Sequence, residues 1–405
     1  MTGWKRILGG SIIALGLCEP GWAQDIKLGV LTDLGGPYAD SSGQGAVEAT
    51  KMAVEDLQAQ LGKRRVEVVS ADHQSKPDVG AAIARRWLDT EGVDAVVNVP
   101  NSAIALAVQT VTRERKRIFL ITGGATAELT GRQCSPYSAH WTDDTYSLST
   151  GTTRAVMERG GADTWFLVTA DYAAGYGLAS AARKVIEGMG GKVVGEAKHP
   201  FGATDQSAFL LQAQSSGAKM IALANAGTDT ILSVKQAHEF HVGPPAQTLV
   251  AMALFITDVH SLGLETAQGL LFDAGFYWDR NDASRAWSRR FFERIGRMPT
   301  REQAETYSAV YHYLRAVIAV GSKEAEPVMA WMKGNPLDDF YAPGARIRAD
   351  GRLIHPIYLF QVKSPAESKY PWDYYKLIAE ISPEHAFRPL EEGACPFVQQ
   401  GAAKP

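Results

Sequence analysis

Small hydroxyl, amide and glycine residues stand at three points of the sequence, each in a loop that follows a short apolar run. They are Ser41 and Ser42, then Asn101 and Ser102, and then Gly124, Ala125 and Thr126. Hydroxyl groups and the free backbone N–H groups of a helix N-terminus bind anions, and the positive end of the helix dipole adds to the attraction. Two such loops side by side could hold one carboxylate. Taken singly, Ser102 is explained equally well as an N-cap that only begins a helix.

The motifs that usually accompany chemistry on a substrate are missing from this sequence. It has no GxGxxG after a strand, no GxxxxGK[ST], no HExxH, no CxxC and no GxSxG, and its nine histidines lack metal-ligand spacing. Asp143 and Asp144 are adjacent carboxylates, but such a pair in a loop is more often solvated or capping than an acid–base pair. We therefore expect a binding protein that needs no cofactor and no metal ion.

The charge of the chain points in the same direction. Its net charge is −3, and it contains no run of Lys or Arg longer than three residues, which argues against nucleic acid as a partner.

Short apolar runs alternate with helical patterns through most of the chain. We expect strands at 26–31, 66–71, 93–99, 117–122, 164–170, 192–199, 220–225, 248–252, 267–275 and 353–362. We expect helices near 46–57 and at 77–90, 175–189, 206–216, 227–241, 283–296 and 301–321. Strands separated by helices of this length predict an α/β fold with parallel sheets covered on both faces. Ligands of such sheets bind beyond the carboxyl ends of the strands, where the polar loops lie.

The first 23 residues are typical of a cleaved export signal. Lys5 and Arg6 precede a short apolar core at 7–17, and small residues precede a cut at Gln24. The apolar core is too short to span a bilayer, so we expect a soluble, periplasmic mature protein. Cys18 leaves a lipid anchor open as an alternative, although Leu17 suits that signal poorly.

Two cysteines remain once such a signal is removed. An even number of cysteines in an oxidising compartment predicts a disulfide between Cys134 and Cys395. The alternative is two unpaired thiols. The disulfide would tie down residues 366–405, which are rich in Pro and aromatic residues and are expected to be irregular.

Five segments follow one another along the chain: IKLGVLTDLGGPYADSSGQG, VEDL, ITGGATAELT, the Asp171-Tyr172…Gly175 loop, and AQGLLF. In these segments the chain resembles the periplasmic solute-binding proteins of branched-chain amino acid type ABC importers, over residues 26–362. The resemblance implies two Rossmann-like lobes joined by three crossover strands, with a ligand cleft between the lobes. It implies a first lobe of residues 24–143 with 276–342 and a second of 144–275 with 343–365. The crossovers are expected at Asp143–Thr145, Ala274–Phe276 and Tyr341–Ala345.

The resemblance also implies which loops hold the ligand. In this family the loops that match Ser102 and Gly124–Thr126 bind the ligand's carboxylate, so Ser102, Gly124, Ala125 and Thr126 receive that role here. Other residues of the crevice loops complete the candidate list: Tyr172, Ala174, Asn225, Ala226, Ala253 and Trp278.

Three positions depart from the family's amino acid binders. Those binders usually carry aromatics at the positions of Ala174 and Ala226, and an acid within the segment 251–255, where this chain has none. An unpaired ammonium group in a closed crevice would be costly. We therefore expect a small organic acid without an α-amine, an aromatic acid being one option. Four aromatic residues could supply the walls of its pocket: Tyr172, Phe255, Tyr277 and Trp278.

The resulting expectation is the substrate-binding component of an ABC importer. It would act as a monomer that captures the acid in the periplasm and delivers it to a permease in the inner membrane. The alternatives are a periplasmic sensor that feeds a signalling receptor, a branched-chain amino acid binder, and an exported enzyme.

Overall fold

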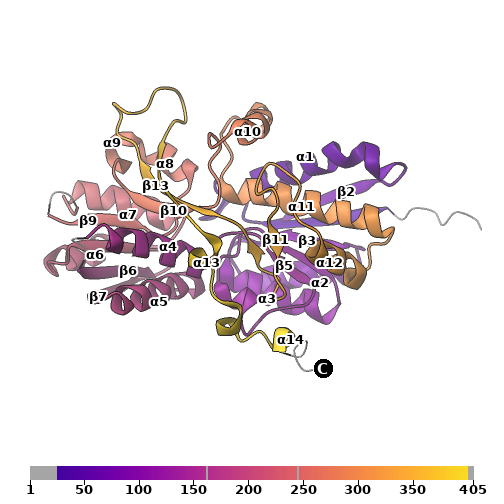
Figure 1. Cartoon of the computed structure of the whole chain (residues 1–405), viewed down its shortest axis with the longest axis horizontal. Helices are drawn as coiled ribbons and strands as arrows, with labels where there is room; N and C mark the ends of the chain where they lie inside the picture. The colour runs from indigo at the N-terminus through magenta and orange to yellow at the C-terminus, as the bar shows by residue number, and fades with distance from the viewer. Residues whose placement is uncertain (1–24, 161–162, 244–245, 400–405) are drawn as a thin grey trace, which may run out of the picture.

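The computed structural model describes residues 25–160, 163–243 and 246–399. These residues form two α/β lobes that lie side by side, the second on the left and the first on the right of Figure 1. The first lobe is built on a five-stranded sheet of order β2-β1-β3-β4-β5, and the second on a seven-stranded sheet of order β14-β13-β10-β9-β8-β6-β7. The expected α/β fold with two lobes is confirmed. The export signal at 1–23 lies outside the described residues.

The first lobe combines the start of the chain with a later segment. Its strands are β1 (Ile26–Thr32), β2 (Val66–Asp72), β3 (Ala95–Asn98), β4 (Ile118–Ile121) and β5 (Ser138–His140), and all their pairings are parallel. Its helices are α1 (Gly43–Leu61), α2 (Pro77–Asp89), α3 (Ser102–Glu114), η1 (Ala127–Thr130), α10 (Asp282–Ile295), α11 (Arg301–Val320) and α12 (Ala325–Gly334). Helix α1 packs on α11 and α2 packs on α3, which buries apolar residues on both faces of the sheet.

The second lobe repeats this plan and adds two antiparallel strands. Its parallel strands are β6 (Thr164–Ala170), β7 (Lys192–His199), β8 (Met220–Ala224), β9 (Thr248–Ala251) and β10 (Leu271–Ala274). Its helices are α4 (Thr145–Glu158), α5 (Ala173–Gly188), α6 (Ser207–Ser215), α7 (Thr228–Glu239), α8 (Ile256–Leu262) and α9 (Leu264–Ala267). Strands β13 (Ile357–Val362) and β14 (Tyr375–Ile381) extend the sheet in antiparallel fashion.

Three segments of the described chain join the sheets of the two lobes: 141–144, 275–281 and 355–356. The first two agree with the expected crossovers, but Tyr341–Ala345 is not the third. That segment lies between α12 and the short strand β11 (Arg346–Ile347), which packs against α12 and pairs with β12 (Leu353–Ile354). Because Arg352 also bridges to His140 of the first sheet, the chain leaves the first lobe only after residue 354, which corrects the boundary placed at 343.

The C-terminal segment is more ordered than expected. Residues 375–381 form β14 instead of an irregular tail, and the chain then returns to the first lobe through α13 (Pro383–Ala386), η2 (Leu390–Gly393) and α14 (Pro396–Gln399). The predicted disulfide between Cys134 and Cys395 is present. Arg388 adds a hydrogen bond of 2.9 Å from Nη2 to the carbonyl oxygen of Ala127. This return segment, residues 382–395, is a fourth link between the lobes, and we call it the strap.

None of the helices in the described part of the chain has the length and apolar character needed to cross a membrane.

Candidate functional site

A small cavity, with about 20 Å³ of free volume in the closed molecule, lies between the two lobes. The first lobe lines it with Tyr38, Pro100, Ser102, Gly123, Ala125, Arg301 and Glu302, and the second with Thr145, Leu148, Tyr172, Ala174, Leu178, Ala226, Ala253 and Phe255. These residues follow strands or lie near helix starts, because helices that succeed parallel strands begin at the carboxyl edge of the sheet. A molecule held in this cavity contacts both lobes at once.

Four helices place a residue of their first turn in the lining of the cavity. They are α3, α4, α5 and α11, which begin at Ser102, Thr145, Ala173 and Arg301. The side chains of Asn101, Asp144 and Thr300 cap α3, α4 and α11, while α5 has no side-chain cap. Because each helix N-terminus carries partial positive charge, this convergence favours an anion in the cavity and disfavours a cation.

Two hydroxyl groups lie in the cavity lining at these helix starts, Ser102 on the first lobe and Thr145 on the second. The Ser102 Oγ accepts the N–H of Thr126 at 3.1 Å, and the Thr145 Oγ1 accepts the N–H of Ala127 at 3.2 Å. The N–H of Thr145 also donates to the carbonyl oxygen of Ala125 at 2.7 Å. Since each hydroxyl oxygen already accepts a backbone N–H, its own proton is available to donate. The pair can therefore bind a carboxylate from both lobes.

Arg301 is a cavity residue whose contacts cross between the lobes. Its Nη1 donates to the carbonyl oxygen of Leu254 at 3.2 Å, and its guanidinium lies 4.2 Å from the ring centre of Phe255. Its Nε lies 3.6 Å from Asp143 Oδ2. Burial opposes the charge of Arg301, but Asp143 raises the pKa of the guanidinium above its usual value. Arg301 thus stays cationic inside the closed molecule and supports the same preference for an anion.

Aromatic side chains close another side of the cavity. Tyr38 of the first lobe and Tyr172 of the second share a hydrogen bond of 2.5 Å between their hydroxyl groups. Phe201 packs beside both rings, with ring centres 6.1 Å from Tyr38 and 4.5 Å from Tyr172. The N–H of Thr228 reaches across to the carbonyl oxygen of Pro37 at 3.3 Å. These contacts stabilise the closed arrangement of the lobes.

The loop that carries Tyr38 is ordered by a cluster of Asp33, Asp72 and His73, whose ligand-type atoms lie within 4.8 Å of one another. The spacing would suit a metal ion, but Asp33, Asp72 and the Nδ1 atom of His73 already accept backbone N–H groups. Asp33 accepts the N–H of Tyr38 at 3.1 Å, and His73 Nδ1 accepts the N–H of Ser75 at 3.1 Å, so the ring proton of the neutral imidazole lies on Nε2. Burial lowers the pKa of His73 to about 4, which keeps the ring neutral.

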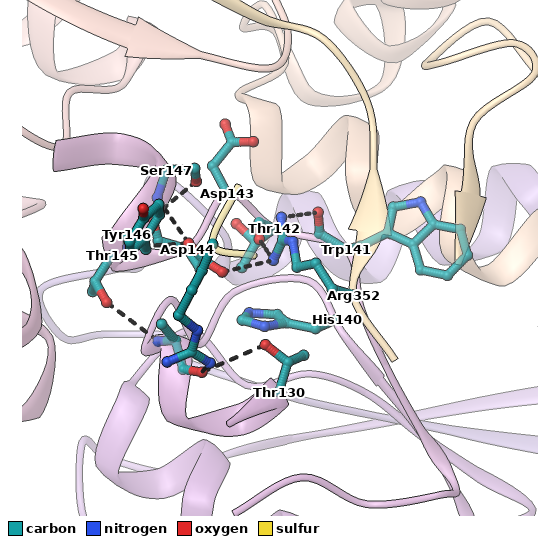
Figure 2. Close-up of polar contacts among 12 residues, drawn as sticks. Thr130, His140, Trp141, Thr142, Asp143, Asp144, Thr145, Tyr146, Ser147 and Arg352 are labelled. Carbon is teal, nitrogen blue, oxygen red and sulfur yellow. Dashed lines mark hydrogen bonds and ion pairs between the residues drawn. The ribbon is translucent and has the colours of Figure 1, made fainter. Parts of the chain in front are cut away.

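Asp143 lies where the three connections between the lobes meet. Its Oδ2 accepts the N–H of Gly275 in the second connection at 2.7 Å, and its Oδ1 lies 3.5 Å from His355 Nε2 in the third. Figure 2 shows Arg352 reaching back to the first connection, where it donates to the carbonyl oxygens of Trp141 and Thr142.

Arg352 also acts on the first turn of α4. Its guanidinium lies 3.9 Å from Asp144, and the side chain of Asp144 accepts the N–H groups of Tyr146 and Ser147. Burial alone would raise the pKa of Asp144, but the charge of Arg352 lowers it below its usual value. The adjacent pair Asp143–Asp144 therefore serves hinge geometry and helix capping, and it positions Thr145 at the cavity.

The structure brings six of the expected binding residues to the cavity. They are Ser102, Ala125, Tyr172, Ala174, Ala226 and Ala253. Six others lie behind the lining and support it: Ser41, Ser42, Asn101, Gly124, Thr126 and Asn225. Trp278 lies elsewhere, because its Nε1 donates to the carbonyl oxygen of Trp372 in the connection before β14.

Four polar residues of the cavity were not expected from the sequence: Tyr38, Thr145, Arg301 and Glu302. A sequence pattern could have indicated Arg301 and Glu302. Thr300 and Gln303 form a capping box, which marks the first turn of α11 and so places Arg301 and Glu302 at a helix start. What the sequence did not reveal was that this helix start, far along the chain, returns to the crevice of the first lobe.

Comparison with protein families matches residues 25–369 to the periplasmic binding protein family. A comparison with curated protein sequences found no match. Among solved structures, a periplasmic binding protein from Burkholderia mallei is 47% identical, with 92% of this chain and 99% of that chain covered and a TM-score of 0.89.

Two further solved structures have the same fold. A branched chain amino acid ABC transporter periplasmic ligand-binding protein from Burkholderia xenovorans LB400 is 39% identical, with 92% and 100% coverage and a TM-score of 0.83. A solute binding protein of an ABC transporter from R. palustris, in complex with benzoate, is 18% identical, with 89% and 97% coverage and a TM-score of 0.79.

Proposed function

The chain belongs to the periplasmic binding protein family of ABC transporters, and from this premise we propose that it captures a small organic acid by closing its lobes and delivers that acid to a membrane permease. Members of this family are periplasmic solute-binding proteins and not enzymes. The export signal at 1–23, which lies outside the described residues, is proposed to be cleaved, and the mature protein is proposed to act as a monomer.

The observation that carries this proposal is the closed cavity at which four helix N-termini and two hydroxyl donors converge. A carboxylate fits the donors Ser102 and Thr145, and the positive helix ends stabilise its charge. Contacts from both lobes give such a ligand more interaction in the closed form than in the open form, so binding shifts the population toward closure.

The charges of the cavity favour an acid without an α-amine. The segment that carries Ala253 and Phe255 contributes no acid, and Arg301 with the helix N-termini repels an ammonium group. The benzoate named for the R. palustris protein makes an aromatic acid the first class to test on this chain.

Branched-chain amino acids are a second candidate, and one observation favours them. Glu302 places a carboxyl group in the cavity from α11, so an acid that could meet an ammonium group is present although the loop after β9 lacks one. The name of the Burkholderia xenovorans protein points to the same class.

A thermal-shift and calorimetric screen of ligand-free protein tests the proposal. Because a ligand that binds only the native state stabilises it, benzoate-like acids are expected to raise the melting temperature and leucine is not. Tight binding of leucine, with none of the acids bound, would favour the second candidate instead.

Thr145→Val tests the carboxylate site itself. Losing one hydrogen bond to a charged group is expected to weaken acid binding about tenfold. Thr110→Val is the matched control, because the Thr110 hydroxyl bonds only the carbonyl oxygen of Leu106 within α3. Equal affinities for both variants would contradict the proposed role of Thr145.

A further inference from the structure

Glu302 is a buried acid whose carboxyl group lies in the wall of the cavity. Its side chain is on the first turn of α11, and the residue is only 3% exposed. Its Oε2 accepts the hydroxyl of Ser41 at 3.5 Å, which is the outer limit of hydrogen-bond geometry. A carboxyl group has about four acceptor positions, so this one long bond leaves acceptor capacity for a further hydrogen bond.

Burial raises the pKa of Glu302, and among its neighbours only the Ser42 hydroxyl opposes this shift through a hydrogen bond. Ser42 donates its hydroxyl to Asn98 at 2.8 Å, and the cationic Arg301 on the same turn donates to the carbonyl oxygen of Leu254. A buried carboxyl group that lacks hydrogen bonds destabilises the protein, and a ligand that supplies one recovers part of that free energy.

We propose that Glu302 selects acids that carry a hydroxyl group in addition to the carboxylate, by forming a hydrogen bond with that hydroxyl. This inference rests on the proposed function, because it assumes that the carboxylate of the ligand is bound at Ser102 and Thr145. The ligand then spans the cavity, with its charged end at these two hydroxyls and its hydroxyl at the start of α11.

Two features make a hydroxyl a better match than an ammonium group. The helix N-termini and Arg301 surround the site with positive charge, which a neutral hydroxyl tolerates and a cation does not. Burial also raises the pKa of Glu302 well above its usual value, against the opposing effect of Arg301. A protonated carboxyl group both donates and accepts, as a hydroxyl does, so the two groups are complementary.

The test compares acids that differ only in the hydroxyl, using the mature full-length protein. Benzoate is paired with its 2-, 3- and 4-hydroxy forms, isovalerate is paired with 2-hydroxyisovalerate, and leucine is included. Calorimetry gives the affinity ratio of each hydroxy acid to its parent. We expect at least one pair to show a ratio of about ten or more in the unmodified protein, the range of a hydrogen bond to a buried carboxyl group.

Two substitutions test whether Glu302 causes the higher affinity for the hydroxy acid. Glu302→Met removes the polar group at similar length and is expected to bring the ratio close to one, while the parent acid keeps its affinity within about threefold. Glu302→Gln keeps an acceptor and a donor and is expected to retain part of the preference, and it remains informative if the Met variant fails to fold. Glu326→Gln, on α12 of the same lobe and bonded to Tyr137 away from the cavity lining, is the control and should leave the ratio unchanged.

Each other outcome overturns the inference in a recognisable way. A ratio that persists in Glu302→Met, or parent acids that bind as tightly as hydroxy acids, refutes the role of Glu302 and leaves the proposed function standing. Binding of leucine that disappears in Glu302→Met shows that the residue meets an ammonium group. Failure of every acid to bind refutes the proposed function itself, and this inference with it.

Discussion

Tyr38 lies on the first lobe, and its hydroxyl contacts Tyr172 of the second. The pair can form only when the lobes are closed, because its members belong to different lobes. Tyr38→Phe removes this hydrogen bond and leaves the packing against Phe201 in place. Since one such bond stabilises by about 1 kcal/mol, the affinity for a bound acid should fall about fivefold. Calorimetry measures the affinity, and small-angle scattering should show a larger unliganded radius of gyration.

Tyr137→Phe is the control for this change. The Tyr137 hydroxyl bonds Glu326 within the first lobe, so its loss should alter neither affinity nor radius. The same affinity for Tyr38→Phe and the unmodified protein would mean that this contact does not contribute to closure.

His355 makes the hinge sensitive to acid. Burial lowers its pKa to about 4, although Asp143 opposes the shift, and Arg352, Arg280 and Tyr341 also face the ring. An unfolded histidine has a pKa near 6.5, so between these values the unfolded chain binds more protons and stability falls as the pH falls. From pH 7 to pH 5 this single group should cost about 2 kcal/mol.

Melting temperatures at the two pH values test this prediction. His355→Gln cannot take up the proton, so its melting temperature should fall less on acidification than that of the unmodified protein. His385→Gln, at an exposed position of α13, should behave like the unmodified protein. An equal fall for all three proteins would assign the acid sensitivity to other groups.

At the scale of elements, the start of α5 depends on a glycine. A Cβ at Gly175 would lie 2.0 Å from the carbonyl oxygen of Ala170 at the end of β6, a contact that backbone atoms cannot relieve. Gly175→Ala should therefore destabilise the second lobe by about 3 kcal/mol or more. Gly188, at the other end of the same helix, has open space around its Cβ position. Gly188→Ala should change stability by less than about 1 kcal/mol, and similar melting temperatures for the two variants would contradict this account.

Helices and strands were predicted well where neighbouring residues alone determine them. The strands at 164–170 and 192–199 begin and end as expected. The helix expected after Ser102 is also present, but its N-cap is Asn101, and Ser102 is its first residue. The expected strand at 353–362 is interrupted, because Pro356 cannot donate a backbone N–H and the chain crosses between the lobes there.

The composition of the cavity was harder to predict, because it depends on which distant segments meet. Ser102 and Ala125 follow neighbouring strands, so their proximity follows from the parallel sheet. Arg301 and Glu302 reach the same place only through the packing of α11 on α1, which no short-range pattern encodes. The expected place of Trp278 in the binding site could not be checked from local patterns for the same reason. Its hydrogen-bond partner Trp372 belongs to a segment for which the sequence predicted no regular structure.

At the scale of the whole molecule, the strap adds a covalent link to the three hinge segments. Cys395→Ser breaks the disulfide to Cys134 and should lower the stability by about 2 to 4 kcal/mol. It should also widen the range of lobe opening, because the strap runs from the second sheet back to the first lobe. Differential scanning calorimetry and small-angle scattering measure these two effects.

A reducing agent supplies the control for the strap. It should lower the melting temperature of the unmodified protein to that of Cys395→Ser and leave the variant unaffected. A variant that melts and scatters like the unmodified, oxidised protein would show that the strap is not needed to hold the lobes.

The same disulfide has a mechanical consequence. Cys134 and Cys395 are separated by 261 positions, and every element of the second lobe, from α4 to β14, lies between them. Tension applied to the two ends of the chain passes directly from Cys134 to Cys395. The loop between them carries no load. A motor that pulls on the N-terminus would therefore strip β1 to β4 from the first lobe, then stall at the cross-link, with the second lobe folded until the bond is reduced.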